Sequence, residues 1–123
     1  MKQYQVSNAY ETICMLSEFK LPVSASYSLY TLAKKLEPTQ MFVDQKKREL
    51  LKEYHGSCDA SGYAHFPTKD EESAFVAAIN ELANLDIEID FKPANIPMNC
   101  LNDAKLSISD ISRLNGFVNF TEV

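Results

Sequence analysis

The clearest local signals in this chain of 123 residues lie in residues 68–91, which read TKDEESAFVAAINELANLDIEIDF. Thr68 and Glu71 have the spacing of a capping box, in which each side chain can bind a free backbone N–H of the other residue. Asp70, Glu71 and Glu72 place negative charge in the first turn, where the helix dipole favours it. The stretch therefore predicts a helix that begins at Thr68.

The spacing of the apolar residues changes within this stretch. Helical spacing relates Phe75, Ile79, Leu82 and Ala83. After Asn84 the spacing is two, and Ile87, Ile89 and Phe91 alternate with Glu88, Asp90 and Lys92. This pattern predicts an acidic helix with one apolar face, followed at once by a strand over residues 87–91 that is buried on one face.

The N-terminal part of the chain predicts three helices, over residues 7–19, 22–36 and 39–54. Ser7 is the expected N-cap of the first, and Pro22 suits the first turn of the second. Pro38 is expected to end the second helix, so that an antiparallel αα-hairpin joins it to the third. Gly56 is expected to be the glycine that ends the third helix. The apolar stripe of the second helix comprises Ala25, Leu29, Leu32, Ala33 and Leu36.

The remaining segments predict short strands and one short helix. Residues 57–66 have the pattern of a hairpin, whereas Pro93 and Pro97 indicate a loop or an edge segment over residues 94–100. Ser107 caps a last short helix, and residues 117–120 form a closing strand or a docked apolar tail. The predicted fold is a compact α+β domain over residues 1–123, with three helices, a small antiparallel sheet and a short C-terminal helix.

Composition narrows the classes of function. The chain is 46% hydrophobic and 24% charged, as is usual for a globular protein, and its net charge of −5 argues against binding to duplex nucleic acid. No apolar run approaches the roughly 18 residues that span a bilayer. The first residues lack the apolar centre of a signal peptide. We therefore expect neither a membrane partner nor secretion through a signal peptide.

The residue types that bind metals are sparse. Cys14, Cys58 and Cys100 are widely separated and form no CxxC pair, and the histidines are His55 and His65. Three such cysteines without a signal peptide indicate reduced thiols of a cytosolic protein. The sequence therefore predicts no zinc site.

The sequence also lacks the patterns that indicate calcium binding or catalysis. A calcium loop that began at Asp59 would have Ala64 where an EF-hand needs glycine, and Asp70 where it needs glutamate. Cys58 lies between the two histidines in sequence, but a nucleophilic pair needs hydrogen-bond contact and an oriented third group. No glycine-rich phosphate loop, HExxH or GxSxG is present. We predict a protein without enzymatic activity, catalytic residues, bound metal or cofactor.

Charge is distributed unevenly along the chain. Between residues 34 and 52 there are six bases and three acids, and between residues 59 and 90 there are one base and eight acids. One interpretation is two solvated helix faces that attract each other weakly. The other is a bipolar surface that stacks head to tail or docks on charged partners.

The predicted strand over residues 87–91 offers a second kind of contact. A small sheet leaves edges that can pair with another chain. The alternative is that residues 117–120 close this edge within the chain. The candidate interaction surface combines both features and comprises Asp70, Glu71, Glu72, Ile87, Ile89, Phe91, Lys46, Lys47 and Arg48.

The order of motifs along the chain resembles a group of small uncharacterised proteins encoded by tailed bacteriophages. The likeness runs through LPVSASYSLYTLAKKLEP, KKRELLKEYHG, the DASGY turn, the acidic helix, IEIDF and LSISDISRLNGFVNF. The resemblance implies a phage-encoded accessory or virion protein in the host cytoplasm or the particle, rather than a metabolic enzyme. It assigns no functional residues.

Two functions are therefore expected. The first is a small structural or assembly part of the phage particle, of the ring or collar type, in which many copies use strand edges and the charge asymmetry. Its partners would be copies of itself or other proteins of the assembly. The second is an inhibitor or modulator of a host system, whose acidic helix blocks a basic site on a host protein.

Overall fold

The computed structural model describes residues 1–101 and 106–121, with only the backbone at position 100. Its helices are α1 (Gln3–Leu16), α2 (Val23–Glu53), α3 (Lys69–Ala83) and α4 (Ile108–Arg113), with a 3₁₀ turn over Met98–Leu101. Its strands are β1 (Ser57–Cys58), β2 (Ala64–His65), β3 (Ala94–Pro97) and β4 (Val118–Thr121). The fold is mixed α+β, as predicted, and it is mostly helical.

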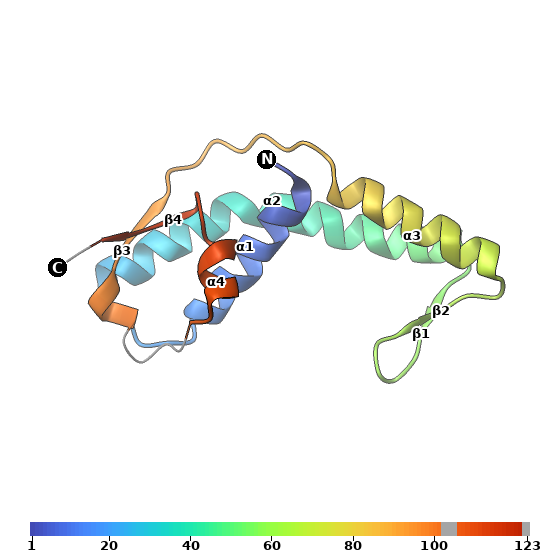
Figure 1. The fold of residues 1–123 in the computed structure, drawn as a ribbon, viewed down its shortest axis with the longest axis horizontal. Helices are drawn as coiled ribbons and strands as arrows, with labels where there is room; N and C mark the ends of the chain where they lie inside the picture. The colour runs from blue at the N-terminus through green and yellow to red at the C-terminus, as the bar shows by residue number, and fades with distance from the viewer. Residues whose placement is uncertain (102–105, 122–123) are drawn as a thin grey trace.

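One long helix organises the molecule. Figure 1 shows α2 running through it, with α1, α4, β3 and β4 gathered around its first half. We call this part the body. The second half of α2 (residues 39–53), the β1–β2 hairpin and α3 extend away from it, and we call this part the arm (Figure 1).

The prediction that Pro38 separates two helices was wrong, and with it the αα-hairpin at residues 37–39. The 31 residues of α2 form one helix with Pro38 inside it. Leu36 and Val43, on either side of Pro38, are both fully buried. A continuous helix keeps both side chains on one stripe, and this burial offsets the backbone hydrogen bond that proline cannot donate.

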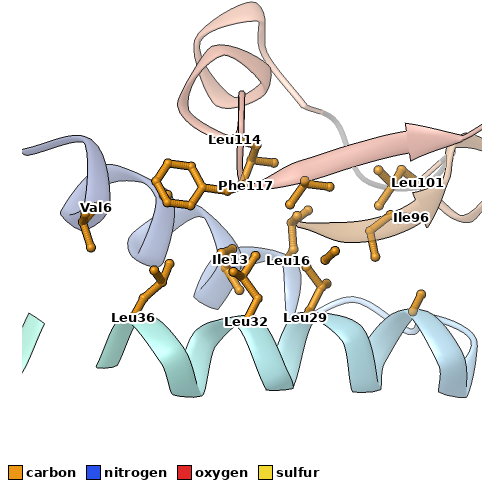
Figure 2. Close-up of a cluster of buried hydrophobic side chains, with 14 residues drawn as sticks. Val6, Ile13, Leu16, Leu29, Leu32, Leu36, Ile96, Leu101, Leu114 and Phe117 are labelled. Atoms are coloured by element: carbon orange, nitrogen blue, oxygen red, sulfur yellow. The ribbon is translucent and has the colours of Figure 1, made fainter. Parts of the chain in front are cut away.

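The core of the body lies between α1 and the first half of α2. Figure 2 shows Ile13 and Leu16 of α1 facing Leu29, Leu32 and Leu36 of α2. From the other side, the cluster is closed by Ile96, Leu101, Leu114 and Phe117. The predicted stripe of residues 25–36 is therefore confirmed. The first helix begins at Gln3 rather than Ser7, because its first turn packs Gln3 and Val6 into the interior.

The predicted single sheet is replaced by two separate pairs of strands. The antiparallel pair β1–β2 forms the predicted hairpin at the far end of the arm. In the body, β3 and β4 pair in parallel, with Ala94 opposite Val118 and Pro97 opposite Thr121. Residues 117–120 thus pair with the segment between the two prolines, and not with residues 87–91.

The predicted strand over residues 87–91 was also wrong. The segment is extended, but it forms no ladder with another described strand. Its start is held by an isolated antiparallel bridge between Lys2 and Asp86 and by the 2.7 Å hydrogen bond that Ile87 N–H donates to the Met1 carbonyl. Ile89 and Phe91 pack against the core while Glu88 and Asp90 are exposed. Alternation therefore predicted one-sided burial correctly and strand pairing incorrectly, because an unpaired extended chain on an apolar surface has the same period.

Candidate functional site

The predicted interaction residues fall into three places. Lys46, Lys47 and Arg48 lie on the arm half of α2, and Asp70, Glu71 and Glu72 form the first turn of α3 at the far end of the arm. Ile87, Ile89 and Phe91 lie in the segment that crosses the body. The arm brings the first two sets onto neighbouring helices, whereas the third set lies apart from them.

The residues of the third set face inward. Ile87, Ile89 and Phe91 are half-buried against the body core, and the ring of Phe91 stacks on Phe117 with centroids 5.2 Å apart. These side chains serve packing. Among the described residues, none forms a hydrogen bond with the backbone groups of residues 88–92.

The far end of the arm is fixed by a local hydrogen-bond network. Thr68 Oγ1 accepts a hydrogen bond from Glu71 N–H at 3.2 Å, which confirms the predicted N-cap of α3. The Glu71 carboxylate does not bind the Thr68 backbone N–H as a capping box requires: its Oε1 accepts a hydrogen bond from Thr68 Oγ1 at 3.4 Å, and its Oε2 lies 2.9 Å from His55 Nδ1. Glu71 therefore ties the start of α3 to the end of α2.

The end of α2 differs in detail from the prediction. His55 takes the left-handed conformation (φ 59°), and Gly56 N–H donates to the Leu51 carbonyl at 2.7 Å, as in a Schellman motif. Gly56 is required for a different reason. A Cβ there would lie 2.5 Å from Leu51 Cδ1 and 2.6 Å from Phe66 Cε1. The glycine allows the chain to turn tightly against these two side chains.

The hairpin turn is held by Asp59. Its carboxylate accepts hydrogen bonds from the backbone N–H groups of Ser61 and Tyr63 and lies 2.7 Å from His65 Nε2. The hydrogen bond to His65, followed by those from the backbone, lowers the pKa of Asp59 below its ordinary value of 3.8. Asp59 and the two histidines therefore stabilise turns. The described residues contain no group of three His, Cys, Asp or Glu that could hold a metal ion.

The charges of the arm are mostly unpaired. Lys46 lies 3.9 Å from Glu49 in the same helix, and in the described parts of the chain no ion pair joins a base of α2 to an acid of α3. The exposed charged side chains without an ion pair there are Asp44, Lys47, Arg48, Lys52, Glu53, Lys69, Asp70, Glu72 and Glu81. The described part of the arm thus leaves charges of both signs available to a partner.

A shallow groove runs between α2 and α3. It has a volume of about 210 Å³. Phe42 is 55% exposed on one side and Leu85 is 41% exposed on the other, whereas Leu50 and Leu82 form the floor. The complete lining comprises Phe42, Lys46, Leu50, Ala78, Glu81, Leu82 and Leu85.

Sequence reasoning missed this groove. Phe42 lies inside the predicted helix over residues 39–54 and Leu85 lies beyond the expected end of the acidic helix, and neither was assigned to an apolar face. The signal was present in the spacing of Phe42, Lys46 and Leu50, which recur every four residues.

Comparison with known proteins adds no relative. No protein-family model, no curated protein and no solved structure matches this chain. Across the part of the chain that the structure describes, none of the helices combines the length and the apolar character needed to cross a membrane. The site must therefore be interpreted from its own geometry, in which the arm is the most distinctive feature.

Proposed function

We propose that this protein acts without catalysis through protein–protein contacts, as a small structural or assembly component of a phage particle, and that the arm makes those contacts. The phage setting rests on the order of sequence motifs. The contact function rests on one observation, namely that the arm exposes apolar side chains of both helices beside charges that have no partner within the described chain.

The construction of the arm supports this proposal. Its buried apolar side chains among the described residues are Val43, Leu50 and Leu82, which lie outside the large core of the body. Two helices cover only one side of each other, so their remaining apolar side chains stay in water. Such a surface, flanked by charged residues, is typical of a site that another protein covers.

Mass spectrometry of purified particles tests the proposal. We expect the protein at a fixed number of copies per particle, and we expect the Phe42→Glu variant to be lost from particles because its charge would be buried at the contact. Tyr63→Glu is the matched control, since Tyr63 is 72% exposed in the hairpin and lies outside the groove. Absence of the wild-type protein from particles would contradict the proposal.

A second candidate function is favoured by the far end of the arm. Asp70 and Glu72 are exposed there without ion pairs in the described chain, close in sequence to the exposed Tyr63. An acidic tip with an exposed aromatic ring suits a modulator that blocks a basic site on a host protein. A pull-down from host lysate with wild type and with Asp70→Lys/Glu72→Lys tests it. Failure to recover a stoichiometric partner that the variant loses would exclude this function.

A further inference from the structure

The groove of the arm has two walls, each of which combines apolar side chains with one charged side chain. Phe42, Lys46 and Leu50 form the wall on α2 at intervals of four residues, and Ala78 and Glu81 of α3 form the other wall together with Leu85, which lies two residues beyond the end of α3. The spacing places Phe42, Lys46 and Leu50 on one face of α2, and Ala78 and Glu81 on one face of α3. Each wall thus carries apolar side chains around a single charge, which is positive on α2 and negative on α3.

None of the described residues covers the groove. Phe42 and Leu85 remain 55% and 41% exposed, while Leu50 and Leu82 beneath them are 6% and 5% exposed. A pair of antiparallel helices gains a closed core when a second pair packs on it, as in a four-helix bundle. The small side chain of Ala78 on the α3 wall would allow another helix to approach closely.

The charges indicate what would pack there. Lys46 contacts Glu49 at 3.9 Å within its own helix, and Glu81 forms no ion pair in the described chain. A partner that matches the groove must offer a negative charge opposite Lys46 and a positive charge opposite Glu81. A second copy placed by a two-fold axis through the groove offers both, because its α3 wall then faces α2 and its α2 wall faces α3.

We infer that the groove is occupied by a second copy of this chain, so that two arms form a four-helix bundle in which Lys46 of each copy meets Glu81 of the other. This inference rests on the proposed function, since it names the partner at the same surface. The two-fold pair is a closed unit. A ring of many copies would need a further contact made by another part of the chain.

Exchange of the two charges tests the inference. We expect wild type to sediment as a dimer at micromolar concentration. Lys46→Glu places two acids against each other twice in the dimer, and Glu81→Lys does the same with two bases, so we expect each variant to dissociate at concentrations at least tenfold higher than wild type. When the two variants are mixed, both contacts become Glu against Lys, and a heterodimer of near wild-type affinity should form.

A matched pair of controls uses charges outside the groove. Lys47→Glu and Glu72→Lys change the net charge by the same amounts but do not line the groove, so each should dimerise alone about as wild type does. Circular dichroism establishes that each variant is folded, which is expected because all four side chains are exposed.

Two results would overturn the inference. One is a wild-type protein that remains monomeric at high concentration, and the other is a mixture of Lys46→Glu and Glu81→Lys that does not form the heterodimer. Neither result bears on whether the protein is part of the particle, because mass spectrometry of particles decides that separately. A monomer that is nevertheless found in particles would mean that another protein of the assembly covers the groove.

Discussion

Single residues at the junction of α2 and the hairpin determine how the arm ends. His55 takes the left-handed conformation, Gly56 leaves room for its neighbours, and Glu71 links the start of α3 to His55. These contacts orient α3 against α2 and thereby form the groove between them. We therefore expect substitutions at this junction to lower the free energy of unfolding of the protein.

Gly56→Ala should destabilise the protein by overpacking. The new Cβ would lie 2.5 Å from Leu51 Cδ1, and the other close neighbour, Phe66, is held by its ring contact with Phe75 at 4.9 Å. Such overpacking costs about 1–3 kcal/mol. Urea unfolding measures the change. Ser57→Ala, at the exposed next residue, is the control and should stay within about 0.5 kcal/mol of wild type.

The hairpin should lose stability in acid. Hydrogen bonds from His65 and from the backbone lower the pKa of Asp59 below 3.8 in the folded state. A lowered folded-state pKa means that the stabilisation is present above about pH 3.8 and is lost as the pH falls through the folded value. NMR titration of the Asp59 carboxyl should give a midpoint below 3.8. A midpoint at or above this value would contradict the hydrogen-bonded turn.

At the scale of elements, α2 carries both halves of the molecule. Its first half packs into the body core, and its second half supports α3 and the hairpin. Pro38 lies between these halves, at the point where the sequence alone suggests two helices. The continuity of α2 is therefore the property on which the arm depends.

Pro38→Ala should stabilise the protein. Alanine restores a hydrogen bond to the carbonyl four residues earlier and removes the clash of the proline ring, and together these changes stabilise the folded state by about 3 kcal/mol. Alanine also gives the unfolded chain more conformational freedom, which lowers the stability by up to about 1 kcal/mol. We expect a net gain of about 2 kcal/mol in the free energy of unfolding, measured in urea. Pro93→Ala, in the extended segment, should show no comparable gain. A loss of stability in Pro38→Ala would contradict a continuous helix.

Local patterns in the sequence predicted most helical segments and the β1–β2 hairpin, but neither the continuity of α2 nor the pairing of distant strands. The Thr68 cap and the apolar stripe of α2 depend on neighbours within a few residues, and both were confirmed. The parallel pairing of β3 with β4 joins residues 24 positions apart, such as Asn95 and Asn119, and no local pattern encodes it. Pro38 was misjudged because burial on both sides of it outweighs its local preference.

For the predicted interaction residues, too, local features were predicted correctly and contacts between distant parts of the chain were not. The sequence located the basic and acidic sets of the arm correctly on two helices, because charge runs are visible without a fold. It could not show that these helices lie side by side, nor that Phe42 and Leu85 border a groove between them. That information depends on how the chain reverses at the hairpin, which is a property of the whole arm.

At the scale of the whole molecule, the structure combines a body with a closed core and an arm whose core is open. The larger apolar cluster lies in the body, and the arm keeps Phe42 and Leu85 partly in water. Elements with few buried apolar contacts open more readily than a packed core. In an isolated chain, the backbone amides of the arm should therefore be less protected from hydrogen exchange than those of the body. A bound partner should increase the protection of the arm.

The central claim is that the arm is the surface through which the protein assembles. Hydrogen exchange detected by mass spectrometry, at concentrations below and above association, tests it most directly. We predict that peptides from residues 39–53 and 69–85 become more protected as the concentration rises, while peptides from α1 and residues 25–36 stay unchanged. Protection that does not depend on concentration, or that increases in the body and not in the arm, would contradict the claim.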